Sequence, residues 1–334
     1  MKKVLFAIIA PLIIFIISSY ADSPTSSSPK YFSYTTSGTP LTATITGLSS
    51  AWTNAGEPGN ISIPSIINGY LVISIGNSAF FYCTKLTSIT IPSSVLGIGD
   101  FAFGNCTKLT SITLSEFVLG IGDDAFVNCF SLTNITVDNG NQYYSSLNGV
   151  LFDVNKHELI QYPCGINGDY TIPSSVTSIG AKAFKNCGGL KNIHIPSSVT
   201  NIGEAAFAGC WNLYNVDIPS SVTSIGKGVF YGCTWLNVHI PPSVTSIGSY
   251  AFANCSERLS IDIPSSVTNI GDRAFGGCTR LEHVYEHAKI PPKIGIDIFT
   301  NCGKLHITVP HGCKDNYNSW KYLLNCYIDE SYLY

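Results

Sequence analysis

A motif of about 23 residues recurs along most of the chain and limits the possible folds more than any other feature of the sequence. Each copy has a phenylalanine followed three residues later by a cysteine, and successive phenylalanines are 23, 23, 58, 23, 23, 22, 23 and 24 residues apart. A period of this kind is typical of stacked supersecondary units, none of which can bury its apolar side chains alone. The nine pairs are Phe80 and Cys83, Phe103 and Cys106, Phe126 and Cys129, Phe184 and Cys187, Phe207 and Cys210, Phe230 and Cys233, Phe252 and Cys255, Phe275 and Cys278, and Phe299 and Cys302.

The residues within one copy predict its local structure. Polar and apolar residues alternate in Thr87–Ile91, which indicates a half-buried strand. Pro92 lacks a backbone N–H and therefore ends the strand. In Asp100–Cys106 the apolar residues are three apart, so this segment is expected to form one helical turn. Stacked copies predict a leucine-rich-repeat solenoid with a parallel β-sheet on one face and short helical turns and loops on the other.

The repeat resembles the BspA-like family, the bacterial surface protein type of leucine-rich repeat. The resemblance rests on Ile172–Gly180 with Ala183, Phe184 and Cys187, and on the corresponding residues of the other copies, over about residues 60 to 310. It implies a right-handed solenoid used for adhesion or other protein binding, and it identifies no partner. The ending is similar to the closing segment of that family at Ile290–Pro292, Val309–Cys313 and Trp320.

Two segments depart from the repeat. Residues 22–40 are rich in Ser, Thr, Gly and Pro and are predicted to be a loose linker. The alternating Leu41–Thr46 is expected to begin an N-terminal cap. Gly149–Phe152 and Leu159–Tyr162 flank a mostly polar segment and predict a β-hairpin insert. The predicted order is therefore a signal peptide (1–21), a linker (22–40), a cap and first repeat (41–74), repeats (75–310) with the insert at about 138–170, and a C-terminal cap (311–334).

The N-terminus has the layout of a secretory signal peptide. Lys2 and Lys3 precede an apolar run, Val4–Ile17, and the small residues Ser19 and Ala21 suit a cut before Asp22. The alternative is an uncleaved anchor, but the run is shorter than the roughly 20 apolar residues of a spanning helix. We therefore expect a secreted or cell-surface protein whose mature form does not span a membrane.

Composition and motifs disfavour several classes of function. The net charge of −3 argues against binding of nucleic acid, which needs a basic surface. No phosphate-binding loop or nucleophile elbow occurs, and no cofactor is expected. His283, Glu286 and His287 spell the inverted zinc-protease motif, which works only on a helix. Here the motif falls on a predicted strand, so we expect no enzyme and no metal.

Twelve cysteines in an exported chain suggest disulfides at first sight. The nine repeat cysteines hold one inward position, where Cys acts as a small apolar residue. Their Cβ atoms are expected to lie at least ~4.8 Å apart, whereas a disulfide needs about 3.8 Å. They are therefore predicted to be free thiols. For Cys313 and Cys326, pairing and free thiols both stay open.

The outward residues of the strands predict a binding face. Three interpretations of its polar middle stay open: a solvated ladder of His and Asp, a patch for a partner protein, and a divalent metal bridged by His194, Asp217 and His239. A strand ladder spreads ligands in a line rather than a tetrahedron, which disfavours the metal. Solenoids generally present their sheet for binding, which favours the partner. One row runs Ser88, Ser111, Asn134, Asn192, Asn215, Asn237, Ser260, His283, His306, and the other Thr90, Thr113, Thr136, His194, Asp217, His239, Asp262, Tyr285, Thr308.

The partner interpretation predicts that binding changes between about pH 5 and 7.5, where histidines take up protons. Exchanging both His194 and His239 for alanine would then alter partner recovery and its pH profile.

Aromatic residues on adjacent copies point to an alternative ligand. Trp211, Tyr214, Tyr231 and Trp235 are close in phase and are predicted to form a rim that binds carbohydrate. The purely structural alternative is that these rings cover gaps in the convex side. The sequence therefore predicts a secreted or cell-surface, adhesin-like protein that binds a host or environmental protein, with proteins of the extracellular matrix or the host surface as candidate partners and a glycan as the second ligand class.

Overall fold

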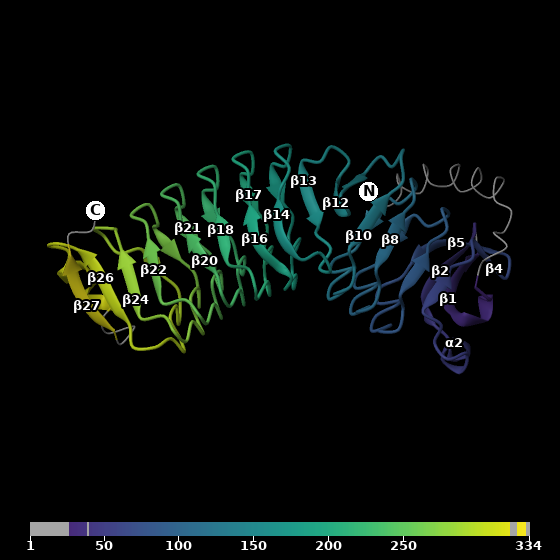
Figure 1. The fold of residues 1–334 in the computed structure, drawn as a ribbon, viewed down its shortest axis with the longest axis horizontal. Coiled ribbons are helices and arrows are strands. Elements are labelled where there is room, and N and C mark those ends of the chain that lie inside the picture. Colours follow the sequence, from purple (N-terminus) through teal and green to yellow (C-terminus); the bar gives the residue numbers. More distant parts are fainter. Residues whose placement is uncertain (1–26, 39, 321–325, 332–334) are drawn as a thin grey trace. The chain divides into compact units, whose positions relative to one another are not determined.

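The computed structural model describes residues 27–38, 40–320 and 326–331. The predicted signal peptide, residues 1–21, lies outside these residues. The chain forms two compact units that divide between Asn155 and Lys156, and each is described by itself (Figure 1). In the described part of the chain, no helix is both long and apolar enough to cross a membrane.

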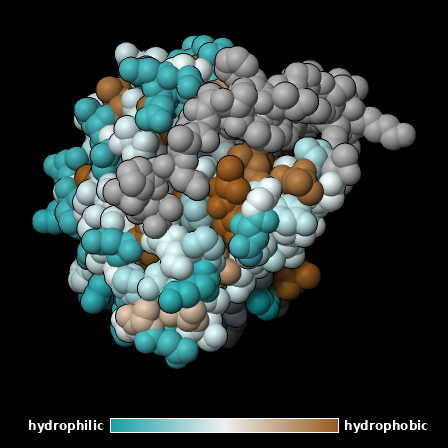
Figure 2. All heavy atoms as spheres, turned by 90° about the vertical axis from the view of Figure 1, so that its right-hand side faces the viewer, coloured by the Kyte–Doolittle hydropathy of each residue, from teal (hydrophilic) through white to brown (hydrophobic). Residues whose placement is uncertain are grey.

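The first unit begins with an antiparallel hairpin and continues as a two-sheet solenoid. Parallel pairing in register joins equivalent residues of successive copies, for example Ile75 with Ile98 and Ile98 with Ile121. Seen from this end of the chain, the surface is mostly polar with small hydrophobic areas (Figure 2). The elements are η1 (Pro29–Tyr31), β1 (Phe32–Gly38), β2 (Leu41–Leu48), α2 (Ser50–Asn54), β3 (Asn60–Ser62), β4 (Ile66–Ile67), β5 (Tyr70–Ile75), β6 (Ser88–Thr90), β7 (Gly97–Ile98), β8 (Ser111–Leu114), β9 (Gly120–Ile121), β10 (Asn134–Val137), β11 (Tyr144–Leu147) and β12 (Val150–Asp153). One sheet has the order β1-β2-β5-β7-β9, with β4 beside β5, and the other the order β10-β8-β6-β3.

The prediction that residues 22–40 form a linker is wrong for its second half. η1 and β1 lie there, and β1 pairs along its whole length with β2. Only Phe32 of β1 is buried, so this strand needs no run of aliphatic residues. Its Ser and Thr residues face solvent, which is why composition alone suggested a loop.

The insert contains a strand that the sequence analysis did not predict. β12 overlaps the first predicted strand of the insert, and β11 pairs with it antiparallel from Tyr144 opposite Asp153 to Leu147 opposite Val150. Asn148 and Gly149 connect the two strands with positive φ angles of 52° and 82°. An Asn-Gly pair between strands is a strong hairpin signal, which the analysis missed at this position.

The second unit repeats the same two-sheet architecture. Its elements are β13 (Glu158–Gln161), β14 (Gly168–Thr171), β15 (Ser178–Ile179), β16 (Leu190–His194), β17 (Asn201–Ile202), β18 (Asn215–Asp217), β19 (Ser224–Ile225), β20 (Asn237–His239), β21 (Ser246–Ile247), β22 (Ser260–Ile263), β23 (Asn269–Ile270), β24 (His283–Glu286), β25 (Lys293–Ile294), β26 (His306–Pro310), η2 (Lys314–Tyr317) and β27 (Tyr327–Ser331). Along one face run the sheets β14-β16-β18-β20 and β22-β24-β26-β27, and along the other β13-β15-β17 and β19-β21-β23-β25.

Part of the insert is a divergent repeat rather than an addition. β13 pairs in parallel with β15, and β14 pairs with β16. The ring of Tyr162 stacks on that of Phe184 with their centroids 4.8 Å apart, in the place of a repeat phenylalanine. The 58-residue gap therefore conceals one more copy, which escaped notice because tyrosine replaces phenylalanine.

A column of stacked phenylalanine rings forms the core of each unit. In the first unit the ring centroids of Phe80 and Phe103 are 5.3 Å apart. In the second, the spacing is 4.8 Å from Phe184 to Phe207 and 5.5 Å from Phe207 to Phe230. These spacings match the offset stacking that aromatic rings prefer. The core position inferred from the repeat is confirmed.

The segment expected to form one helical turn is a series of hydrogen-bonded turns instead. In Asp100–Cys106, Phe101 and Asn105 have positive φ angles of 54° and 61°, which a helix does not allow. Successive copies are also joined here, because the N–H of Phe103 donates to the carbonyl of Ala125. The turn side is therefore bonded from copy to copy, as the sheets are.

The cysteines follow the prediction that they are free, and most of the repeat cysteines share one hydrogen-bonding role. All twelve are free thiols. Seven repeat cysteines donate S–H to the carbonyl oxygen of the phenylalanine one copy earlier, at Sγ to O distances from 3.0 Å (Cys106 to Phe80) to 3.3 Å (Cys255 to Phe230). Burial raises the pKa of the Cys255 thiol to about 12. Only a protonated, reduced sulfur can make this bond.

Thiol titration tests this arrangement. In the native protein at pH 8 the seven buried repeat thiols, all except Cys83 and Cys302, are expected to react slowly with a thiol reagent, because they are buried and remain protonated. After denaturation without a reductant, at least the nine repeat cysteines are expected to titrate. Fewer than nine thiols would show that some of them pair, and fast labelling of the native protein would place them near solvent.

Candidate functional site

The outward strand residues of the second unit lie in register, as the two predicted rows require. On the first of its sheets, Asn192 pairs with Asn215 and Asn215 with Asn237. In the second row of that sheet, His194 is opposite Asp217, which is opposite His239. The other sheet aligns Ser260, His283, His306 and Tyr327 in one row and Asp262, Tyr285, Thr308 and Asp329 in the other.

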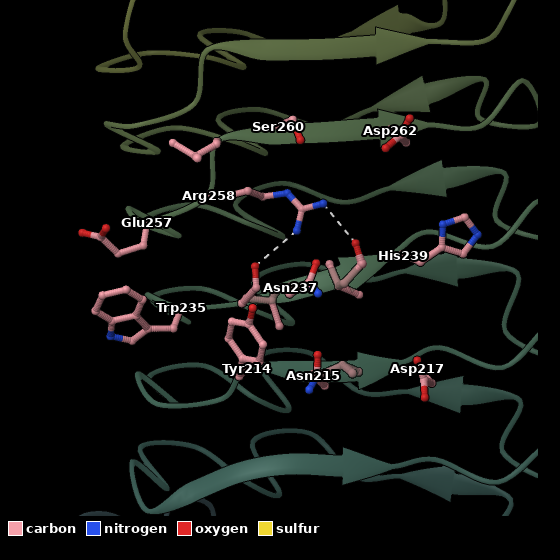
Figure 3. A pocket seen from close by; sticks show the side chains of 14 residues that line it. Tyr214, Asn215, Asp217, Trp235, Asn237, His239, Glu257, Arg258, Ser260 and Asp262 are labelled. Atoms are coloured by element: carbon pink, nitrogen blue, oxygen red, sulfur yellow. Dashed lines mark hydrogen bonds between the residues drawn. The ribbon is translucent and has the colours of Figure 1, made fainter. Parts of the chain in front are cut away.

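A break separates these two sheets. In the described part of the chain no backbone ladder joins β20 to β22. The guanidinium of Arg258 lies in the gap and donates from Nη1 to the carbonyl of Leu236 at 3.2 Å and from Nη2 to that of Val238 at 3.0 Å (Figure 3). The Arg258 side chain therefore forms hydrogen bonds with two backbone carbonyl oxygens of the preceding copy.

The cause of the break can be read in the sequence. Three residues after the repeat cysteine, other copies have a core leucine, as at Leu213 and Leu281, but this copy has Arg258. The copy before it is one residue shorter between its leucine, Leu236, and its strand, which gives the 22-residue spacing from Phe230 to Phe252. Arginine is longer than leucine and carries donors, so it fills the gap that the shorter copy leaves.

Arg258 is partly buried and remains charged. Burial lowers the pKa of its guanidinium, and the charge of nearby Asp262 opposes this shift. Arginine keeps its proton at neutral pH in proteins. The Nε atom is buried and has no hydrogen-bond partner. The pocket wall therefore includes a cation that is held against main-chain oxygens.

The break opens a pocket of about 640 Å³ on the sheet face. Figure 3 shows the Trp235 and Tyr214 rings toward one end and His239, Asp217 and Asp262 toward the other, with Arg258 between the strands. The rings are exposed, at 53% for Trp235 and 52% for Tyr214. The lining includes five of the eight predicted site residues, namely Tyr214, Asp217, Trp235, His239 and Asp262.

The other three predicted residues do not line the pocket. His194 lies one strand away from it, opposite Asp217. Tyr285 lies opposite Asp262 on β24. The ring of Trp211 covers Gly188, where a Cβ atom would meet its carbons at 2.0 Å. The rim predicted around Trp211 and Trp235 therefore contributes only Trp235 and Tyr214 to the pocket.

Polar contacts orient several groups at the pocket. Asn215 donates from Nδ2 to Oδ1 of Asn192 at 2.9 Å, which leaves its own Oδ1 as an acceptor. Glu257 pairs with Arg280 at 2.5 Å. Asp262 is 3.4 Å from Nε2 of His287.

Sequence reasoning missed Arg258 and Glu257 as pocket residues, although the arginine at a leucine position was visible.

The zinc-protease-like motif falls on a strand, as predicted. β24 alternates, so His283 is exposed whereas Glu286 is fully buried on the opposite side. Among the described residues, no three His, Cys, Asp or Glu side chains are placed to hold a metal ion. His194, Asp217 and His239 lie in one line across three strands, which is the arrangement that disfavoured a metal.

The C-terminal segment closes the second unit. β27 pairs in parallel with β26, and the rings of Tyr317 and Trp320 are buried with their centroids 5.2 Å apart. Tyr317 donates its hydroxyl hydrogen to the carbonyl of Ala288 at 2.7 Å. β27 also extends the two outward rows by Tyr327 and Asp329, which lie beyond the repeats and were missed for that reason.

The chain was compared with protein families and with known proteins. The family described as the BspA type leucine-rich repeat region matches in six copies, over residues 59–153, 161–282 and 200–321. No curated protein matches. A leucine-rich cell surface protein of Faecalibacterium prausnitzii is 34% identical with a TM-score of 0.60, over 71% of this chain and 62% of that one. This chain therefore spans less than two thirds of that protein.

Two further solved structures share the fold. The pneumococcal vaccine antigen PcpA is 21% identical with a TM-score of 0.55, over 83% of this chain and 72% of that one. A leucine-rich repeat protein from Eubacterium ventriosum is 22% identical with a TM-score of 0.53, over 85% and 95%. At these identities the likeness concerns the fold alone.

Proposed function

Because the chain belongs to the family of BspA-type leucine-rich-repeat proteins, we propose that it is an exported surface protein that binds another protein through the sheet face of its second unit. The similar protein of F. prausnitzii is a cell surface protein, which supports the location. The predicted signal peptide agrees with it. Binding, rather than catalysis, is the proposed role.

One observation carries the choice of site. The pocket at the break between β20 and β22 gathers five side chains that were selected as binding candidates from the sequence alone. Ligand pockets combine apolar and aromatic walls with a few placed polar groups. Tyrosine and tryptophan are also enriched among the residues that contribute most to protein interfaces.

A matched pair of tryptophan variants tests the site. Trp235→Ala is expected to weaken capture of a partner from extracellular-matrix and mucosal extracts by about tenfold or more, as for a central interface tryptophan. Trp211→Ala serves as the control, because this exposed ring lies outside the pocket lining. Circular dichroism would confirm that both variants fold. Equal losses, or none, would place the binding surface elsewhere.

A glycan is the second candidate ligand. The observation that favours it is the presence of two exposed rings, Trp235 and Tyr214, in one pocket with the amides of Asn215 and Asn237. A glycan array probed with the wild type and Trp235→Ala separates the two candidates. Binding to a defined sugar that is lost in Trp235→Ala, with no protein captured, would favour the glycan.

A further inference from the structure

We propose that the pocket between β20 and β22 binds a basic side chain, a lysine or an arginine, that a partner protein presents. This inference rests on the proposed function and names the chemistry of the partner at that site. It follows from the charges, the hydrogen-bond acceptors and the aromatic rings of the pocket.

Two carboxylates at one end of the pocket form no ion pair with a lysine or arginine of the described chain. The two are Asp217 and Asp262, which are both exposed. The only ion pair of Asp262 among the described residues is with a histidine, His287, at 3.4 Å, and Arg258 lies nearby without pairing with it. Glu257, in contrast, is already paired with Arg280. Two negative groups are therefore available to a cation from outside.

The positive charge of Arg258 does not cancel both carboxylates. Its Nη1 and Nη2 atoms are held by the carbonyls of Leu236 and Val238, so its side chain is fixed between the strands. With neutral histidines, the two carboxylates outnumber this one guanidinium, and the Glu257–Arg280 pair adds no net charge. An acidic side chain entering the pocket would meet both carboxylates and be repelled.

The other end of the pocket suits the aliphatic stem of a basic residue. The rings of Tyr214 and Trp235 are about half exposed. Lysine and arginine pack their aliphatic stems on apolar surface, and their charged heads are attracted to aromatic faces. The oriented Oδ1 of Asn215 adds an acceptor, and basic side chains carry only donors. Rings, acceptors and carboxylates line one pocket.

Short peptides test this inference directly. The full-length mature protein would be immobilised, and acetylated, amidated pentapeptides with a central Lys, Arg, Glu or Leu between glycines would be passed over it. The Lys and Arg peptides are expected to bind and the Glu and Leu peptides not to bind. Raising the NaCl concentration from 50 to 300 mM is expected to weaken binding, because exposed charges are screened.

Variants locate the site. Asp217→Asn with Asp262→Asn is expected to weaken binding of the Lys peptide by about tenfold, because both counter-charges are lost while the shape is kept. Glu204→Gln is the control for loss of a surface carboxylate elsewhere, since this residue pairs with Lys227 and is not part of the pocket lining. Equal binding of the Glu peptide, or full binding by the double variant, would overturn the inference.

The failure of this inference is distinguishable from that of the proposed function. If no basic peptide binds but Trp235→Ala still abolishes partner capture, the pocket binds a protein through other chemistry. If a neutral trisaccharide binds at the pocket and no peptide does, the ligand is a glycan and both proposals fail. If peptides bind and Trp211→Ala reduces their binding as much as Trp235→Ala does, the basic ligand binds outside the pocket.

Discussion

Replacing Phe207 with alanine is expected to lower the free energy of unfolding by about 3–5 kcal/mol. The side chain is fully buried, and its ring centroid lies 4.8 Å from that of Phe184 and 5.5 Å from that of Phe230. Removing the ring leaves a cavity between two stacked rings that the bonded repeats on either side cannot easily close. Urea denaturation followed by circular dichroism measures the loss.

The control for Phe207 lies in the next copy. Tyr231 is 43% exposed, so Tyr231→Ala is expected to cost less than about 1 kcal/mol. A loss below about 1 kcal/mol for Phe207→Ala would contradict the buried column of rings. A large loss for Tyr231→Ala would show that the turn side also contributes a core.

Glu286→Gln is expected to stabilise the protein at pH 8.5 by on the order of 5 kcal/mol and to leave stability at pH 4 nearly unchanged. Glu286 is fully buried; its Oε1 accepts a hydrogen bond from the Ala288 N–H at 3.1 Å, and its Oε2 has no partner. Burial raises the pKa of this carboxyl to about 8, although the hydrogen bond from Ala288 opposes the shift. Glutamine keeps the shape and removes the charge.

The direction of the pH effect follows from the raised pKa. In the unfolded chain a glutamate carboxyl has a pKa of about 4.3, so the folded protein holds a proton that the unfolded chain releases between the two values. The stabilising contribution is present below about pH 4.5 and is lost as the pH rises toward 8. Denaturation across this range for the wild type and Glu286→Gln measures it.

An exposed neighbour provides the control. Glu282 lies on the same segment and faces solvent, so Glu282→Gln is expected to leave the pH profile of the wild type unchanged. A Glu286→Gln variant with that same profile would show that Glu286 is ionised in the folded protein at little cost. Such a result would require water to reach Oε2.

Most of the repeat architecture follows from the sequence because its signals are local and occur many times. The spacing of Phe and Cys sets the phase, and period-2 alternation then determines which strand residues face outward. These two signals are sufficient to predict that Asp217 and His239 lie opposite each other on neighbouring parallel strands. The same alternation places Glu286 on the inward side of its strand, although the charge of a glutamate by itself would predict an exposed position.

Other features depend on single residues that depart from the repeat, so the repeat pattern does not predict them. β1 consists mostly of polar residues that stay exposed, and a hairpin partner stabilises it rather than an apolar face. Tyr162 takes the place of a repeat phenylalanine, and its ring fills the same position in the column of stacked rings. A pattern that requires phenylalanine therefore does not find this copy. The pocket depends on one missing residue and one arginine, and only the geometry shows that Arg258 bridges to Leu236 and Val238.

The interruption at Arg258 is one-sided, and this has a mechanical consequence. At the level of the gap the opposite sheet, β19-β21-β23-β25, continues without a break, and the rings of Phe230 and Phe252 remain stacked at 5.5 Å. Two side-chain hydrogen bonds on a long arginine yield to bending more readily than a backbone ladder does. The second unit is therefore expected to bend more easily at this gap than where both sheets are continuous, so that a ligand seated in the gap would stiffen the protein there.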